Sequence, residues 1–126
     1  MKKNIRLLAI LLAAIVSSCA SNEHIIIDKA APNAECEVGD TVEIALEENP
    51  TTGYVWRINN DGFPVLNLES QAYEPREASK NLAGSGGTII YTFKAAKPGE
   101  AKVKLTRARP WENKPIDSAE FDITVQ

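Results

Sequence analysis

The chain of 126 residues predicts an all-β fold, because from residue 25 onward its dominant hydrophobic period is two. That part of the sequence carries no stretch of ten or more residues with a helical repeat. All seven glycines and most of the seven prolines fall between the alternating runs or at their ends, where turns tolerate positive φ or a missing donor. Seven to eight short strands in about 100 residues are typical of an immunoglobulin-like β-sandwich, although a small barrel would share this periodicity.

The expected strands follow one another along the chain. Short apolar segments at 25–27 and 35–38 come first, and then the run 41–47 places Val42, Ile44 and Leu46 on one face. The remaining expected strands are 54–58, 65–73, 89–93, 101–105 and 121–125. Trp56 shares the apolar face of its run, so we expect it in the core, like the buried tryptophan common in such sandwiches.

Two kinds of connection join these strands. Tight turns are predicted at 38–40, 60–62 and 97–100, where glycine stands beside aspartate or proline. The longer connections are 49–53, 81–87 and 108–117. These three follow alternate strands, and such loops leave a sandwich at the same end. The sequence therefore predicts that three separated segments meet at one tip.

Residues 1–18 have the pattern of an export signal. Lys2, Lys3 and Arg6 form a basic start, and the uncharged run 7–16 is too short to span a bilayer as a helix. The following Val16-Ser17-Ser18-Cys19 resembles the lipobox of bacterial lipoproteins, in which the cysteine is lipidated and becomes the mature N-terminus. An ordinary cleavable signal with a chance cysteine is the alternative.

These features predict three segments: a lipoprotein signal peptide at 1–18, a lipidated N-terminus and tether at 19–30, and a folded domain at 31–126. We expect an exported protein anchored through Cys19 to a bacterial membrane, the outer membrane in the first instance, on its periplasmic or surface side. Several acyl chains on one cysteine would hold it firmly, since a single chain binds only marginally.

The charge and the cysteines narrow the range of functions. Removing 1–18 takes away three of the 14 basic residues and none of the 17 acidic ones, which leaves a net charge of −6. An acidic domain is a poor nucleic-acid binder, so no nucleic-acid partner is expected. With Cys19 acylated, Cys36 has no partner for a disulfide, and we expect it to be a small buried residue in a strand.

Enzymatic constellations are missing from the sequence. The only histidine is His24, in the expected tether, so neither Ser-His-Asp nor Cys-His catalysis is expected. No His/Cys cluster has ligand spacing, so we expect neither a metal nor a cofactor. Glu47 and Glu48 are interpreted as a solvated strand end, because a catalytic pair needs burial to separate its pKa values. The sequence predicts a binding protein and not an enzyme.

Three motifs on the long connections carry a family resemblance. N-P-T-T-G-Y at 49–54, G-S-G-G-T at 84–88 and R-P-W at 109–111 resemble, in this order, the chagasin family of cysteine-peptidase inhibitors. The resemblance implies an immunoglobulin-like fold whose three loops lie across the active-site cleft of a papain-like peptidase. The implied peptidase-binding residues are Asn49, Pro50, Thr51, Thr52, Gly53, Tyr54, Gly84, Ser85, Gly86, Gly87, Arg109, Pro110 and Trp111.

The residues themselves make this role plausible. Pro50 fixes φ and Gly53 permits a sharp exit, so Thr51 and Thr52 would form a stiff apex that enters at the catalytic centre. The glycines of the second motif would let a main chain approach the enzyme closely.

The third motif leaves alternatives open. Trp111 has the profile of a binding hot spot, but it would have no such role if it folded back on the sandwich. Arg109 would either pair with acidic groups of the enzyme or brace its own loop.

The sequence therefore predicts a reversible, monomeric inhibitor of papain-like cysteine peptidases whose natural target is either an endogenous or a host enzyme. A surface adhesion or assembly module with the same fold is the alternative, and in such a module the loop motifs would be dispensable.

Overall fold

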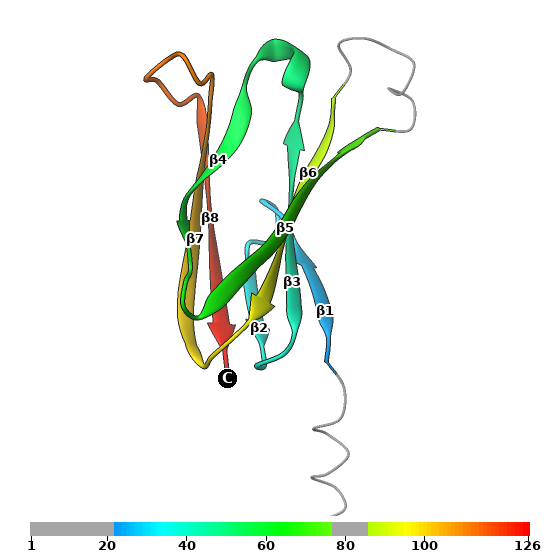
Figure 1. Cartoon of the computed structure of the whole chain (residues 1–126), viewed down its shortest axis with the longest axis vertical. Coiled ribbons are helices and arrows are strands. Elements are labelled where there is room, and N and C mark those ends of the chain that lie inside the picture. Colours follow the sequence, from blue (N-terminus) through cyan, green and yellow to red (C-terminus); the bar gives the residue numbers. More distant parts are fainter. Residues whose placement is uncertain (1–21, 77–85) are drawn as a thin grey trace, which may run out of the picture.

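The computed structural model describes residues 22–76 and 86–126, which form two β-sheets packed face to face (Figure 1). Their strands are β1 (His24–Ile27), β2 (Asn33–Cys36), β3 (Thr41–Glu48), β4 (Val55–Asp61), β5 (Leu66–Pro75), β6 (Gly87–Ala95), β7 (Gly99–Ala108) and β8 (Asp117–Val125). The first sheet has the order β1-β3-β6-β5 and the second has the order β2-β8-β7-β4. Two separate sheets exclude the barrel and confirm the predicted sandwich. In these described residues, no helix has the length and apolar character needed to cross a bilayer.

The two earliest strands extend the sheets at their edges. β1 pairs in parallel with β3, and β2 pairs in parallel with β8, while every other pairing is antiparallel. β1 confirms the strand expected at 25–27 and extends it to His24, which aligns with Thr41 in the sheet, so the sheet begins inside the segment 19–30 that was expected to hold the tether. Its Nε2 lies 3.0 Å from Glu43 Oε2, which holds the histidine on the sheet surface.

The core is built from the inward residues that the period of two predicted. Val42, Ile44 and Leu46 of β3 are buried, and the large rings at the centre belong to Tyr91, Phe93 and Phe121. Trp56 is only 6% exposed, which confirms its place in the core. Cys36 is buried at the end of β2, and burial raises the pKa of its thiol, helped by the nearby carboxylates of Asp40 and Glu37. This thiol is therefore an inert packing group, as expected.

Tight turns close one end of the sandwich, which we call the base: 37–40, 62–65 and 96–98. Gly39 and Gly62 have φ values of +99° and +78°, which explains the glycines there. Asp40 is buried and accepts hydrogen bonds of 2.8 Å from the backbone N–H groups of Glu23 and Glu37. These two bonds hold the pKa of Asp40 below its ordinary value. The beginning of the described chain is thus fastened to the base.

Candidate functional site

The other end of the sandwich, which we call the tip, carries the connections β3–β4 and β7–β8, together with the end of β5 and the start of β6 (Figure 1). Contacts join the described parts of these loops: Arg109 bonds to Thr52, and Gly86 lies against Glu48 and Asn49. The prediction that three separated segments meet is therefore confirmed for these parts. Gly84 and Ser85 lie outside the described residues.

The first loop is a short 3₁₀ helix, Pro50–Thr52, that is organised by Asn49. The Oδ1 atom of Asn49 accepts hydrogen bonds from the backbone N–H of Thr51 at 3.1 Å and from its hydroxyl at 2.6 Å. The hydroxyl of Thr52 donates to the carbonyl oxygen of Asn49 at 2.8 Å. Both threonine hydroxyls thus fix the backbone of the loop itself, which is the local role of asparagine and threonine side chains in turns.

The exit from this loop depends on Gly53. Its φ of +85° is a left-handed conformation that residues with a Cβ rarely adopt. Asn49 and Tyr54 then face each other as a bridge that closes the loop at its root. Pro50, Thr51 and Thr52 are exposed beyond this closure. The loop therefore presents a short, internally bonded apex to solvent.

Arg109 braces this loop from β7–β8. Its Nε donates to the carbonyl oxygen of Thr52 at 3.2 Å, and its guanidinium carbon lies 4.3 Å from the centre of the Tyr54 ring. Its Nη1 also lies 3.7 Å from the carboxylate of Glu112 in its own loop. Of the two roles considered for Arg109, the structure shows the brace: one planar side chain couples two loops through a hydrogen bond and a cation–π contact.

Trp111 is exposed at the tip. Its side chain is 71% exposed, and it does not fold back into the core. One edge of the indole packs beside Gly53, because a Cβ built on that glycine would lie only 2.8 Å from Trp111 Cη2. Pro110, beside it, is exposed as well. A large rigid ring held against a neighbouring loop is available for a partner at little cost in ordering entropy.

The glycines of the second loop have an internal explanation. Gly86 and Gly87 are both buried. A Cβ on Gly87 would collide with the carbonyl of Glu74, and one on Gly86 would lie 3.0 Å from the carbonyl of Glu48. Packing against the main chains of β3 and β5 therefore explains why both positions are glycine, and close approach of this loop to a peptidase main chain stays a prediction.

Glu48 was also wrongly interpreted from the sequence. It is only 8% exposed, whereas Glu47 beside it is solvated as expected. Glu48 Oε1 accepts the backbone N–H of Trp56 at 2.8 Å, so it ties the end of β3 to β4 in the opposite sheet. The signal was present in the alternation of β3, where position 48 continues the inward series of Val42, Ile44 and Leu46.

The buried phenol of Tyr91 lies in the same region. Burial, assisted by the charge of Glu48, raises the pKa of Tyr91 to about 12. Its hydroxyl stays protonated and donates to the carbonyl oxygen of Trp56 at 3.3 Å. The start of β4 is thus held by two buried groups below the first loop.

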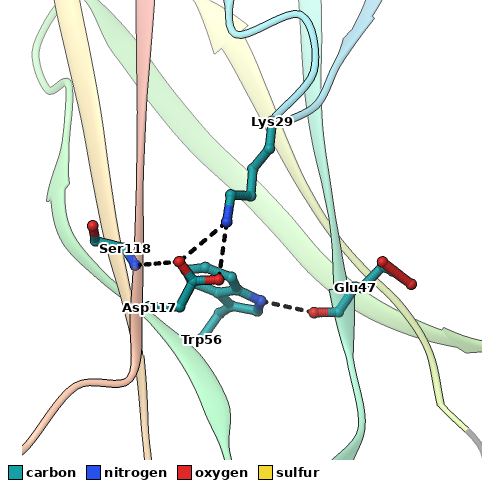
Figure 2. A network of polar contacts seen from close by, with 5 residues as sticks. All are labelled: Lys29, Glu47, Trp56, Asp117 and Ser118. Carbon is teal, nitrogen blue, oxygen red and sulfur yellow. Dashed lines mark hydrogen bonds and ion pairs between the residues drawn. The ribbon is translucent and has the colours of Figure 1, made fainter.

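A polar network covers the flank of the sandwich below the tip (Figure 2). Lys29 Nζ lies 2.9 and 3.1 Å from the two carboxylate oxygens of Asp117 and 5.7 Å from the centre of the Trp56 ring. The hydrogen bond from Lys29 is the main reason that the pKa of Asp117 lies below its ordinary value. The indole Nε1 of Trp56 donates to the carbonyl oxygen of Glu47 at 2.8 Å. The network borders a shallow cavity of about 370 Å³.

In residues 22–76 and 86–126, no group of three or more His, Cys, Asp or Glu side chains is placed to hold a metal ion. His24 is occupied by Glu43 on the surface, and Cys36 is buried in β2. The tip combines a stiff apex, a guanidinium brace and an exposed indole, which are the features of a preformed protein-binding surface.

The fold and the tip together define a β-sandwich that presents three loops for recognition. The sequence model of the family described as chagasin family peptidase inhibitor I42 matches residues 35–125. Chagasin from Trypanosoma cruzi is 32% identical over 91 residues, which cover 68% of this chain and 80% of that protein. The chain therefore belongs to the chagasin family, which is a family of peptidase inhibitors and not of enzymes.

Solved structures show the same fold. The cysteine protease inhibitor EhICP2 from Entamoeba histolytica matches with a TM-score of 0.72 at 23% identity, over 82% of this chain and 96% of that one. PbICP-C, solved in complex with falcipain-2, matches with a TM-score of 0.51 at 22% identity, over 84% of this chain and 92% of that one. At these sequence identities, the structural similarity shows that the chains share the fold of the sandwich.

Proposed function

We propose that this protein is a reversible inhibitor of papain-like cysteine peptidases that occludes the active-site cleft with its tip. Family membership supports inhibition. The cysteine protease inhibitor EhICP2 and the complex of PbICP-C with falcipain-2 support a cysteine peptidase as the partner. The apex Thr51-Thr52 enters the cleft at the catalytic centre, and the other two loops flank it. The proposal defines the target enzyme by its papain-like active-site cleft, whether that enzyme is endogenous or comes from a host.

The mechanism follows from the stiffness of the apex. Asn49 and the two threonine hydroxyls hold the 3₁₀ helix, and Arg109 holds it from the neighbouring loop. The conformational entropy of this loop is therefore largely spent on folding, which favours tight association. A compact helical turn also differs from the extended main chain that a peptidase cleaves. The loop therefore fills the cleft without presenting a peptide bond in a cleavable pose.

The single observation that carries this proposal is the coupling of the first and third loops by Arg109, with Trp111 exposed beside them. Trp111 is the exposed aromatic side chain of this surface, and the first loop beside it is held in place by Arg109. Binding hot spots usually have this arrangement. An interface of three loops buries on the order of 1,600 Å² in total, enough for nanomolar binding.

The test is an inhibition assay of residues 20–126 against papain, with caspase-like and legumain-like peptidases as other classes. We expect competitive inhibition of papain alone. Trp111→Ala should weaken it by at least about 1 kcal/mol, a factor of five or more. Phe63→Ala is the matched control, because Phe63 is 69% exposed at the base and should leave inhibition unchanged. Inhibition of no papain-like enzyme would contradict the proposal and favour an adhesion or assembly module.

We further propose that the chain is exported and anchored to a bacterial membrane by acylation of Cys19. The support is the sequence: a basic start, an apolar run and Val16-Ser17-Ser18-Cys19 in the order of a lipobox. The mass of the protein extracted from bacterial membranes should equal that of residues 19–126 plus the acyl groups. Cys19→Ser should abolish membrane association. Size-exclusion chromatography of residues 20–126 tests the proposed monomer.

A further inference from the structure

The described chain begins at the base, and the base holds it there. The backbone N–H of Glu23 donates to Asp40 Oδ1 at 2.8 Å, and the carbonyl of Glu23 accepts from the N–H of Thr41 at 2.9 Å. Asn22 packs on Gly39, since a Cβ on that glycine would lie 2.9 Å from Asn22 Oδ1. Figure 1 shows β1 starting at the end of the sandwich opposite the tip, where the C-terminus also lies. The direction in which the chain leaves the fold is thus set by bonds on both sides of Glu23.

Covalent geometry limits how far the proposed lipid lies from this point. Only Ala20 and Ser21 stand between Cys19 and Asn22. Three residues span at most about 11 Å when fully extended. A strand such as β7, with ten residues, is about 33 Å long. An anchor at Cys19 therefore reaches the base and cannot reach the tip.

The base exposes apolar side chains at its rim. Phe63 is 69% exposed and Val38 is 47% exposed, each in one of the tight turns. Both turns bond to the end of β6 or to the turn 96–98 that follows it: Gly39 N–H donates to the carbonyl of Ala95, and Ala96 N–H donates to the carbonyl of Val65. Pro64 on the β4–β5 turn and Pro98 on the β6–β7 turn are exposed as well. Val38 precedes Gly39, on which Asn22 packs, so Val38 lies close to the start of the described chain, whereas Phe63 is exposed on the β4–β5 turn. Exposed apolar and aromatic side chains at the end of a fold that carries a short lipid anchor are suited to contact with a bilayer interface.

The charges around the base indicate whether contact with a lipid surface would be electrostatic or hydrophobic. The exposed ionisable side chains at the base and directly beside it are Glu23, Glu37, Lys97 and Glu100, with half-buried Lys94 near Asp40 and the C-terminal carboxylate of Gln126 near Cys36. Negative groups outnumber the two lysines, so attraction to anionic headgroups does not drive contact. The apolar side chains and the anchor remain as the attractive contributions.

We propose that the base docks on the lipid surface through Phe63 and Val38, so that the tip stands on the order of 30 Å from the membrane and faces the aqueous compartment. The proposal rests on the acylation of Cys19 proposed above. The short connection between Cys19 and Asn22 then has a function. It keeps the base at the bilayer, so that the three loops extend into the aqueous compartment and are accessible to the active-site cleft of a peptidase.

Depth-dependent fluorescence quenching tests this orientation on the mature, lipidated chain (residues 19–126) in phosphatidylcholine vesicles with brominated acyl chains. The only natural tryptophans are Trp56, buried in the core, and Trp111, exposed at the tip. In the parent chain, bromolipid should leave the emission unchanged. Phe63→Trp adds a probe at the base, and we expect brominated lipid to quench most of the emission that this probe adds. Residues 20–126 carrying Phe63→Trp, which lack both Cys19 and the apolar run 7–16, should show no quenching on the same vesicles.

Quenching of Trp111 in the parent chain, or none in acylated Phe63→Trp, would overturn the docked orientation. The mass of each preparation is measured first. A chain without acyl groups would contradict the proposed anchor, and the docking proposal, which depends on that anchor, would fail with it. Papain inhibition by vesicle-bound parent chain is measured in parallel and should match that of residues 20–126 within about twofold. Loss of inhibition by both forms would instead count against the inhibitory function.

Discussion

The two ends of β3 carry buried carboxylates with different tasks. Asp40 precedes the strand at the base and accepts two backbone N–H groups from segments beside it. Glu48 ends the strand at the tip and accepts one backbone N–H from Trp56 in the opposite sheet. At the base, tight turns are joined by main-chain hydrogen bonds. At the tip, the loops are joined by a side chain, that of Arg109.

This difference separates stability from recognition. The base closes on itself, so damage there should lower the free energy of unfolding and leave the tip intact. The shape of the tip depends on contacts between segments more than 50 residues apart in sequence, such as Arg109 with Thr52. Damage there should change affinity more than stability. Four substitutions test this comparison, from the largest expected effect to the smallest.

Gly53→Ala should have the largest effect on inhibition. The φ of +85° disfavours alanine by about 1–2 kcal/mol, and the new Cβ would displace the indole of Trp111. We expect the inhibition constant for papain to rise at least about thirtyfold, which corresponds to roughly 2 kcal/mol.

Gly62→Ala is the matched control at the base. Its φ is +78°, and its Cβ would lie 3.0 Å from the Cβ of Ala101. It should lower the denaturation midpoint while the folded fraction inhibits normally. Equal losses of inhibition in the two glycine variants would show that the ends are not independent.

Asp40→Asn should lower the free energy of unfolding by about 1–3 kcal/mol at neutral pH, because two bonds to a buried carboxylate lose their charge. The pKa of Asp40 is depressed in the folded state. Its contribution is therefore complete above the unfolded value of about 3.9 and is lost as the pH falls through the lower folded value. Urea denaturation from pH 7 to pH 2 should show the parent and variant converging below about pH 4, with inhibition at neutral pH unaffected.

Glu48→Gln should affect both properties. The amide oxygen can still accept from Trp56, so we expect a loss of stability of about 1 kcal/mol as the charge-assisted bond becomes neutral. Because Glu48 lies directly before the first loop, inhibition should weaken about two- to fivefold as well. Stability and inhibition are measured on the same preparations. A stability loss with unchanged inhibition would place Glu48 with Asp40 as a purely structural group.

Arg109→Lys should have the smallest effect, roughly 0.5 kcal/mol on inhibition, because lysine keeps the charge but loses the planar contact with Tyr54 and the Nε–H bond to Thr52. Arg57→Lys, on an exposed face of β4, is the control for a generic arginine replacement. Unimpaired inhibition by Arg109→Lys would indicate that charge alone matters at this position.

Much of the fold was predictable because alternation reports burial directly. The inward series of β3, β6, β7 and β8 were all recognised, and the three motifs predicted a common tip. The errors came where a polar residue has a long-range partner. Glu48 looked like a strand end because its acceptor role depends on Trp56 eight residues later in another sheet. The apolar segment 25–27 predicted a strand, but its parallel pairing with β3, which includes His24, leaves no local signal.

The sequence by itself determined the all-β class, the strand order along the chain, the buried Trp56 and Cys36, and the three loop motifs that identify the family. These properties follow from local periodicity, turn chemistry and residue identity. The tertiary structure alone decided that Arg109 braces the first loop, that Gly86 and Gly87 face neighbouring strands, and that Glu23 is bonded to Asp40 at the base. Such contacts join residues distant in sequence, and only the packing of the two sheets brings them within hydrogen-bonding or van der Waals distance.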